Sequence, residues 1–231
     1  MNGPEAGAAP GVDDLERGRV LPRFAAPTRW VHGATAVFTI VCVLSAAVLY
    51  DGTLAVAVGH RGLVEHVHVY TGFALPVPLL VGVVFRSYRE DGRRLNRWTA
   101  RDWSWLRRRT RRDGTLQVGK FNAGQKTNAA LSVGSIAALL VSGLTMWFPQ
   151  LAGIAWRSGA TFVHDWFALA FGLLAVGHVA MALRDPHAMT GMRTGRVPLR
   201  WARREHGAWA RELAGEPPLV PDPPSSTSRD H

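Results

Sequence analysis

Residues 164–178 read HDWFALAFGLLAVGH and contain the most informative pattern of the chain. Apart from its first two residues and its last it is apolar, and it lies within a longer apolar run, 160–183. His164 and His178 are fourteen positions apart. In an α-helix this separation is about 40° short of four full turns, so both imidazoles lie near one helical face, about 21 Å apart along the axis. The stretch predicts a long apolar helix that carries one imidazole near each end.

Three further apolar runs of similar length occur in the chain. Each is close to the roughly 20 residues that an α-helix needs to cross a hydrocarbon core of about 30 Å. Asp165 is the one charged residue within the four runs, which are 31–49, 67–84, 128–148 and 160–183. The pattern predicts an all-α integral-membrane protein, built as a bundle of four membrane-spanning helices.

The composition of the chain excludes several other classes of protein. Of the 231 residues, 47% are apolar and 19% are charged, and the charges gather between the apolar runs. This segregation excludes a long disordered chain. Because Cys42 is the only cysteine, the chain cannot by itself form a disulfide framework, a cysteine-ligated iron–sulfur cluster, a structural zinc site or a c-type haem attachment.

The positive charges are distributed unevenly among the segments that connect the apolar runs. The formal net charge is +10; 13 Lys and Arg lie in 86–126, eight follow Leu183 and four precede Trp30. The other two connections hold one each, Arg61 and Arg157. By the positive-inside rule, both termini and the 86–126 loop are predicted to be cytoplasmic. Topology thus accounts for the arginine runs, and we expect no nucleic-acid partner.

The ends of the chain differ in composition from its centre. Both ends are rich in Gly, Pro or Ser, which predicts a disordered leader over 1–22 and a disordered tail over 210–231, around a four-span domain at 23–209. Within the middle loop, 98–112 combines three tryptophans with many arginines. This segment is predicted to be an amphipathic helix at the cytoplasmic interface of the membrane.

The histidines within the apolar runs pair by depth. If the first run rises from the cytoplasm, His32 and His178 lie near the cytoplasmic side, and His68 and His164 lie near the outer side. An ionisable residue inside a membrane span is costly and marks function by default. Two bis-imidazole sites stacked across a bilayer are the arrangement expected of a cytochrome b with two b-type haems. Two imidazoles leave the iron no open position, so such a haem carries electrons.

The second run begins with two histidines, of which only one can face the interior. His66 and His68 lie about 200° apart on a helix. A haem ring stacked along a helix needs small side chains near its ligand, and Gly72 follows His68 by four residues, whereas Tyr70 follows His66. This favours His68 as the ligand. The corresponding residues for the other three candidates are also small, namely Ala36, Ala168 and Ala182.

Each histidine also has a less specific interpretation. A single histidine near a helix end is usually an interfacial or hydrogen-bonded residue. Asp165, beside His164, could hydrogen-bond at the outer surface or simply begin the helix. A zinc site is disfavoured because the two pairs are far apart and lack thiolate or carboxylate partners. The remaining histidines are predicted to be solvated in loops and tails: His60, His187, His206 and His231.

Five stretches together resemble the membrane cytochrome b (gamma) subunit of respiratory formate dehydrogenases, within the prokaryotic cytochrome b561-like group. They are RFAAPTRWVHG (23–33), HVYTG (68–72), GKFNAGQKTN (119–128), HDWFALAFGLLAVGH (164–178) and GMRTGRVPLRWARREHGAW (191–209). The resemblance implies a four-helix bundle with two b-type haems. It implies His32 and His178 as ligands of the cytoplasmic-side haem, and His68 and His164 as ligands of the outer haem.

The resemblance also implies a quinone site beside the cytoplasmic-side haem, formed by Asn122, Gly124 and His178. From the residues alone, the GKFNAGQK turn has a second interpretation. Asn122 could cap the helix that follows, and Lys126 could extend to lipid headgroups. Arg23, Arg29 and Lys126 could pair with haem propionates or anchor the interface.

The function implied is electron transfer from an iron–sulfur (beta) subunit through two haems to menaquinone or ubiquinone, in the bacterial inner membrane. Formate oxidation would belong to a molybdenum- or tungsten-containing (alpha) subunit. The alternatives are a cytochrome b of a hydrogenase or another molybdoenzyme, a stand-alone cytochrome b561, and a haem-free membrane anchor. Three features depart from the family. An extra histidine, His66, stands beside the expected His68. Pro76 and Pro78 predict a kink in the second span, and the outer segment 51–66 is short.

Overall fold

The computed structural model describes residues 18–108 and 117–217, which fall into two compact units. The larger unit consists of 22–98 and 123–197, and the smaller unit consists of the described residues up to 21, 99–122 and those from 198 onward. The chain passes between the units at two short strands, β1 (Val20–Pro22) and β2 (Arg196–Pro198), and also after residues 98 and 122. Most of the predicted disordered leader and tail lies outside the described residues.

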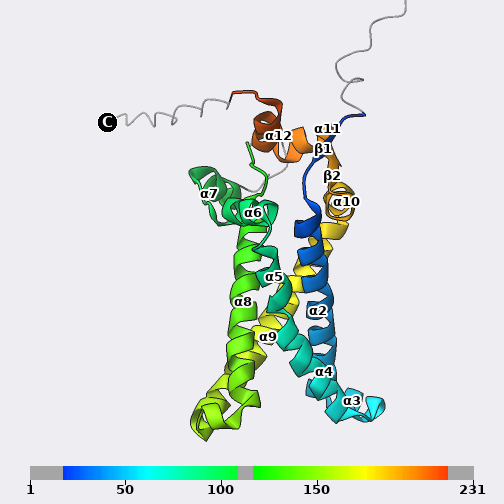
Figure 1. Cartoon of the computed structure of the whole chain (residues 1–231), viewed down its shortest axis with the longest axis vertical. Coiled ribbons are helices and arrows are strands. Elements are labelled where there is room, and N and C mark those ends of the chain that lie inside the picture. Colours follow the sequence, from blue (N-terminus) through cyan, green and yellow to red (C-terminus); the bar gives the residue numbers. More distant parts are fainter. Residues whose placement is uncertain (1–17, 109–116, 218–231) are drawn as a thin grey trace, which may run out of the picture. The chain divides into compact units, whose positions relative to one another are not determined.

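The larger unit contains three helices that are long and apolar enough to cross a membrane. A fourth candidate is a helix broken into pieces, so the unit provides three spans, or four if the broken helix is counted. The chain is therefore a mostly helical membrane protein (Figure 1). The three uninterrupted helices are α2 (Ala26–Tyr50), α8 (Ala123–Trp147) and α9 (Ile154–Leu183).

The broken helix corresponds to the second apolar run. Its first piece, 61–82, consists of α4 (Arg61–Ala74) and α5 (Pro76–Gly82), separated at Leu75, and its second piece is α6 (Arg86–Asn96). Pro76 and Pro78 have no backbone N–H, so neither can donate to the carbonyl four residues earlier, and the helix is interrupted where the prolines predicted a kink. After α5 the chain turns by 101° into α6 (Arg86–Asn96).

The turn between α5 and α6 is stabilised by an arginine and a close glycine contact. Nη1 of Arg89 donates to the carbonyls of Val83 and Val84, both at 2.8 Å, and so satisfies acceptors that the end of α5 leaves free. A Cβ at Gly82 would lie 2.9 Å from the Tyr88 ring and from Val31. Only glycine therefore lets α2, α5 and α6 approach so closely.

Packing within the larger unit follows two main contacts. Helix α2 lies along α4 and α5, and α8 lies along α9, whereas α9 approaches α2 and α4 only sparsely. The buried centre is an apolar cluster of Leu75, Ile136 and Phe171, with Phe38 and Leu174 packed against it. Phe171 is the one buried residue of α9. Helix α9 thus makes few close backbone approaches to α2 and α4, the two helices that carry the partners of its histidines.

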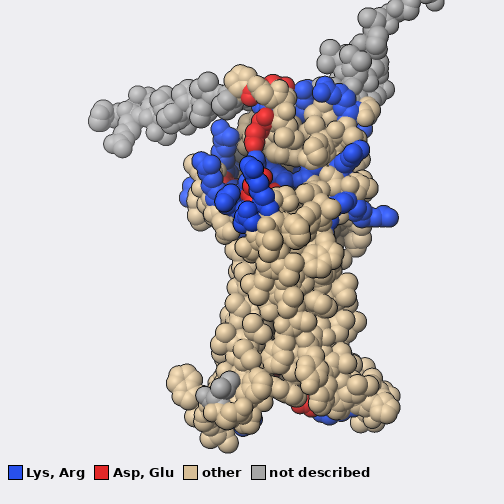
Figure 2. All heavy atoms as spheres, in the orientation of Figure 1, with Lys and Arg blue, Asp and Glu red and all other residues tan. Residues whose placement is uncertain are grey.

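Charged residues mark one end of the helices of the larger unit. The end at which α2 and α8 begin and α9 ends carries the arginines of α6, together with Lys126 and Arg184; we call it the basic end. The opposite end carries Arg61 and Arg157 beside the short elements α3 (Gly52–Val58) and η1 (Pro149–Leu151). Between the ends, the helices show an uncharged surface in Figure 2.

At the basic end, α10 (Pro186–Thr194) fixes the segment that leads into α2. The carbonyl of Gly195 accepts from the backbone N–H of Arg23 at 2.7 Å and of Phe24 at 3.2 Å. Gly195 has a positive φ of 82°, and a Cβ there would lie 2.5 Å from the Phe24 carbonyl oxygen. Both the conformation and the close approach require glycine, which explains the last residue of the GMRTG motif.

The described part of the smaller unit contains three short helices. His206, one of its histidines, contradicts the prediction that it is solvated. His206 is only 2% exposed, and its Nδ1 lies 2.7 Å from the carbonyl of Gly119. Its ring lies between the buried Trp201 and Trp209. The flanking tryptophans bury the imidazole, and the carbonyl satisfies it. The helices are α7 (Ala100–Arg107), α11 (Leu199–Glu205) and α12 (Gly207–Ala214).

Helix α7 covers 100–107 of the segment 98–112 that is predicted to be an amphipathic helix, and Thr99 and Arg108 flank it in extended conformations. Thr99 and Asp102 form a capping box at its start, which explains why the helix begins at Ala100. Trp103 is exposed, whereas Asp102 is buried. Residues 109–112 lie outside the described residues.

Candidate functional site

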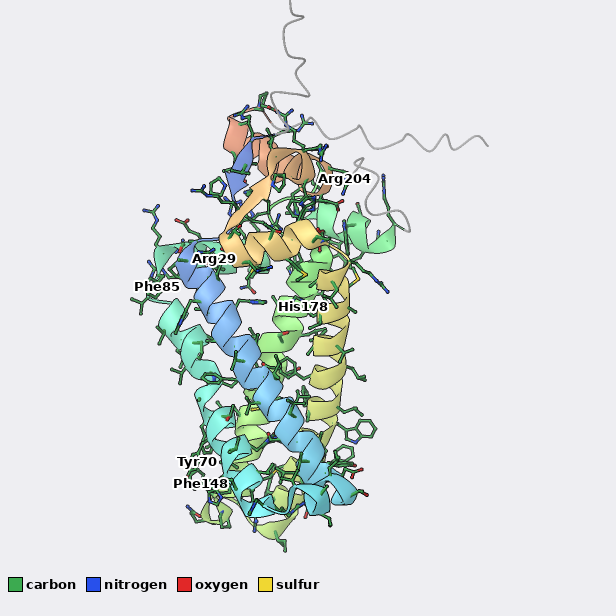
Figure 3. The ribbon with its side chains drawn as sticks, turned by 90° about the vertical axis from the view of Figure 1, so that its right-hand side faces the viewer. Arg29, Tyr70, Phe85, Phe148, His178 and Arg204 are labelled. Carbon is green, nitrogen blue, oxygen red and sulfur yellow. The ribbon has the colours of Figure 1, made fainter. Side chains whose placement is uncertain are left out.

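Four histidines of the larger unit meet in two facing pairs. The ring centres of His68 on α4 and His164 on α9 are 6.2 Å apart, with 70° between the ring planes; we call them the opposite-end pair. The ring centres of His32 on α2 and His178 on α9 are 6.0 Å apart, with 55° between the planes; we call them the basic-end pair. The structure thus brings together the partners that the depth argument paired, and Figure 3 shows His178 between α9 and α2.

These separations suit two imidazoles that bind one metal ion from opposite sides. A metal–nitrogen bond is about 2 Å long and the nitrogen lies about 1 Å from the ring centre, so the ring centres of such a pair are about 6 Å apart. Among the described residues, no group of three or more His, Cys, Asp or Glu could hold a metal ion. The donor set is therefore two imidazoles per site, as in haems that carry electrons.

The opposite-end pair is held by two serine hydroxyls. Oγ of Ser45 on α2 lies 2.9 Å from Nδ1 of His68, and Oγ of Ser142 on α8 lies 3.0 Å from Nδ1 of His164. Gly143 lies beside the second ring, since a Cβ there would come within 3.4 Å of the His164 ring, at van der Waals distance. With Nδ1 of both rings occupied, Nε2 is the nitrogen left for a metal.

The basic-end pair has a different neighbour. Nδ2 of Asn128, in the second turn of α8, lies 3.5 Å from Nδ1 of His178. The sequence predicted Asn128 only as the start of the third span. Its side chain could be recognised as a candidate only once the fold had placed it opposite a histidine 50 positions later. No serine or threonine hydroxyl bonds His32 or His178 among the described residues.

A small residue follows each paired histidine by four positions, about one helical turn, which suits a planar macrocycle beside the helix. Gly72, four residues after His68, has open space beside it, since a Cβ there would meet nothing within 4 Å. Ala36, Ala168 and Ala182 are partly buried at the same offset from the other three histidines. Together with the sparse contacts of α9 with α2 and α4, these residues fit a haem at each pair.

His66 and Asp165 do not belong to either pair. Nδ1 of His66 lies 2.7 Å from the carbonyl of Gly62, and its ring lies beside Trp147 and Tyr70 at 5.8 and 6.0 Å. Figure 3 shows Tyr70 at the end of the bundle far from His178. Asp165 is exposed on α9, and so are His60 and His187. His231 lies outside the described residues.

The three residues of the predicted quinone site fall in different units. Asn122 closes a segment of the smaller unit, and Gly124 and His178 belong to the larger unit. Asn122 directly precedes α8, where a helix cap would stand, and Gly124 lies in the first turn of that helix. The quinone site stays a prediction.

Lys126 does not extend to lipid headgroups, contrary to one of the two interpretations of its motif. It is only 8% exposed. Its Nζ donates to the carbonyl of Arg97 at 2.8 Å and lies 5.9 Å from the ring centre of Trp98. The ammonium is drawn inward because a carbonyl and an aromatic face replace its water. Lys126 therefore ties the end of α6 to the start of α8.

The two arginines near the start of α2 also have protein partners. Nη1 of Arg29 donates to the carbonyl of Arg193 at 2.8 Å, and Figure 3 shows Arg29 beside α10. Arg23 is 3% exposed. Burial lowers the pKa of Arg23 to about 10, against the opposing effect of the Asp185 and Asp91 carboxylates. At neutral pH Arg23 thus remains a cation, favoured by the charges of the two carboxylates.

Comparison with known proteins agrees with this geometry. The profile of the family described as prokaryotic cytochrome b561 matches residues 23–195, which is most of the chain and includes all four paired histidines. The chain belongs to the prokaryotic cytochrome b561 family. It is therefore a membrane cytochrome of the b type, and the family implies b-type haem as its cofactor.

The similar proteins include cytochrome b556 subunits of formate dehydrogenases. The chain is 26% identical over 208 residues to the cytochrome b556(fdo) subunit of formate dehydrogenase from Escherichia coli K12, an alignment that covers 86% of this chain and 96% of the relative. The nitrate-inducible cytochrome b556(Fdn) subunit from the same organism is 31% identical over 99 residues, covering 42% of this chain and 46% of the relative. The cytochrome b556 subunit from Haemophilus influenzae is 33% identical over 99 residues, 41% of each chain.

Proposed function

We propose that this chain is the membrane cytochrome b subunit of a formate dehydrogenase, which carries electrons from an iron–sulfur partner subunit to a quinone. The observation that carries the proposal is the two histidine pairs, at 6.0 and 6.2 Å, near opposite ends of one helix bundle. The formate dehydrogenase subunits among the relatives support the identity of the complex.

Each pair holds one b-type haem, with His68 and His164 as ligands at the opposite end and His32 and His178 at the basic end. A haem with two imidazole ligands supplies a one-electron redox centre that has no open position for oxygen. The chain orients the four rings and keeps them on one side of α9. The cluster around Phe171, seven residues from both His164 and His178, keeps water out of the region between the two sites.

The distribution of charge supports a direction for the electrons. The basic end is cytoplasmic by the positive-inside rule, so both termini lie in the cytoplasm and the protein spans the bacterial inner membrane. Electrons enter at the opposite end, where α3 and η1 offer a surface to the iron–sulfur subunit. A molybdenum- or tungsten-containing subunit oxidises formate.

Electrons leave at the basic end, where menaquinone or ubiquinone binds near Asn122, Gly124 and His178. The amide of Asn122 donates to a quinone carbonyl, and Gly124 lets the quinone approach the backbone. Quinone reduction takes up protons, and at this end they come from the cytoplasm.

The test is a reduced-minus-oxidised spectrum of the purified protein with its haem-to-protein ratio. We expect a b-type band, two haems per chain, and about half the haem in His164→Ala and in His178→Ala. A protein without a b-type band would be a haem-free anchor, and the proposal would fail.

The electron donor distinguishes the possible complexes. In native membranes, formate should reduce the haems of this chain. Reduction by hydrogen but not by formate would assign the chain to a hydrogenase. Reduction by neither, in a chain that purifies without partners, would indicate a stand-alone cytochrome b561.

A further inference from the structure

The hydrogen bonds of the opposite-end pair repeat one pattern on two different helices. Oγ of Ser45 lies 2.7 Å from the carbonyl of Val41 and 2.9 Å from Nδ1 of His68. Oγ of Ser142 lies 2.7 Å from the carbonyl of Ala138 and 3.0 Å from Nδ1 of His164. In each case the hydroxyl lies between its own helix and a histidine of a neighbouring helix.

Each serine hydroxyl donates its one proton to a carbonyl of its own helix. A hydroxyl has one proton to donate, and the carbonyl four residues earlier can only accept. Two oxygens 2.7 Å apart need a proton between them, so each serine donates to its own helix. It must then accept from the imidazole, which places the proton of His68 and of His164 on Nδ1. The unprotonated nitrogen, Nε2, is the one that binds a metal.

We propose that Ser45 and Ser142 are positioning residues that fix the tautomer and the ring angle of the opposite-end pair and so set the redox potential of the haem bound there. The inference rests on the proposed haem function. An imidazole that donates from Nδ1 to an acceptor is more basic at Nε2. A more basic ligand stabilises ferric iron, so both serines lower the potential of this site.

The redox potentials of the two sites should consequently differ, because in the described part of the chain serine hydroxyls bond the histidines of only one pair. Among the described residues no serine or threonine hydroxyl bonds either histidine of the basic-end pair, and the side chain of Asn128 lies 3.5 Å from Nδ1 of His178. Replacement of either serine should therefore move one of the two redox transitions and leave the other in place.

The experiment is a redox titration of the b-type bands in the intact complex, for wild type, Ser45→Ala, Ser142→Ala and the double variant. We expect the opposite-end transition to shift upward, with the ferrous-to-ferric ratio at a fixed potential rising roughly two- to tenfold per lost hydrogen bond. The electron paramagnetic resonance of the ferric state, which responds to the angle between the ring planes, should change for the same haem. His164→Ala, which retains only the basic-end haem, identifies the transition.

Two further variants separate positioning from general damage. Ser142→Thr keeps the hydroxyl and should keep the wild-type potential. Ser135→Ala is the matched control, because Ser135 is a buried serine of the same helix without a hydrogen bond to a paired histidine. If an alanine variant loses half the haem and the threonine variant retains it, the positioning role is again supported.

The remaining outcomes overturn the inference. Wild-type potentials and resonance signals in both alanine variants, with two haems bound, would show that the serines do not act on the ligands. An equal shift in Ser135→Ala would show a nonspecific effect of removing a hydroxyl. A wild-type protein without haem would instead refute the proposed function, a result visible before any variant is made.

Discussion

His66 and His68 stand two positions apart on α4 and have different neighbours. His66 is exposed and bonds the Gly62 carbonyl, whereas the His68 ring faces His164. We therefore expect His66→Ala to retain both haems and His68→Ala to lose the opposite-end haem. The haem-to-protein ratio of the two purified variants is the measurement. Loss of haem from His66→Ala alone would reverse the assignment.

The amide of Asn122 provides a prediction about quinone. Asn122→Ala should keep both haem bands and normal reduction by the donor, because its side chain binds no haem. Reoxidation by added menaquinone should slow roughly three- to tenfold, the loss expected for one hydrogen bond of about 0.5–1.5 kcal/mol. Stopped-flow absorbance of the b-type band measures this rate.

A different result would show that Asn122 only caps α8. The variant would then lose about 1 kcal/mol of stability and reoxidise at the wild-type rate once folded. Thermal unfolding of the same preparation distinguishes the two roles.

The paired histidines could be predicted from the sequence, but the serines that contact two of them could not. His32, His68, His164 and His178 could be paired by depth, because helix direction and rise follow from the apolar runs and the charges. Ser45 and Ser142 lie 23 and 22 positions from their histidines, and only packing shows which rings they meet. A serine inside an apolar run needs a hydrogen-bond partner for its hydroxyl, which makes it a candidate. Many such serines, however, bond only a carbonyl of their own helix, so the sequence does not show which of them contact a histidine.

At the scale of the helices, two glycines should respond to alanine in opposite ways. A Cβ at Gly82 would lie 2.9 Å from Val31 and from the Tyr88 ring, whereas a Cβ at Gly92 would meet nothing within 4 Å. Gly82→Ala should destabilise the protein by about 1–3 kcal/mol because α2, α5 and α6 must separate. Gly92→Ala should be neutral or stabilise it by up to about 1 kcal/mol, since alanine favours a helix.

Thermal unfolding in detergent, followed by circular dichroism, compares the two variants. Equal midpoints would mean that the turn between α5 and α6 does not depend on the close contact at Gly82.

The apolar runs predicted the positions of the long helices but not all of their ends. Helix α9 begins at Ile154 rather than near 160, and α8 begins at Ala123 rather than near 128. Hydropathy cannot distinguish a polar first turn from a loop. The interruption at Pro76 was predictable from its missing N–H, whereas the 101° turn into α6 was not. That turn depends on Arg89 reaching carbonyls five and six residues earlier.

For the whole molecule, the charges predict an orientation that reporter fusions can test. Fusions after Gly59 and after Gly153, both at the opposite end, should report the outer side. Fusions after Asn96 and at the C-terminus should report the cytoplasm, because the arginines of α6 resist translocation. Alkaline phosphatase and green fluorescent protein fusions give complementary signals. A cytoplasmic signal after Gly59 or Gly153 would reverse the proposed direction of electron flow.

The fourteen positions between His164 and His178 have a consequence for energy storage. Along the helix they span about 21 Å of a hydrocarbon core about 30 Å thick, so the two sites lie across roughly two thirds of the insulator. Under the proposed function, an electron that crosses this distance toward the negative cytoplasmic side does electrical work. A full crossing is worth about 2.3 kcal/mol per 100 mV, so this one stores roughly 1.5 kcal/mol per 100 mV. The spacing of the two histidines along α9 would thus let each electron that passes between the sites contribute to the membrane potential.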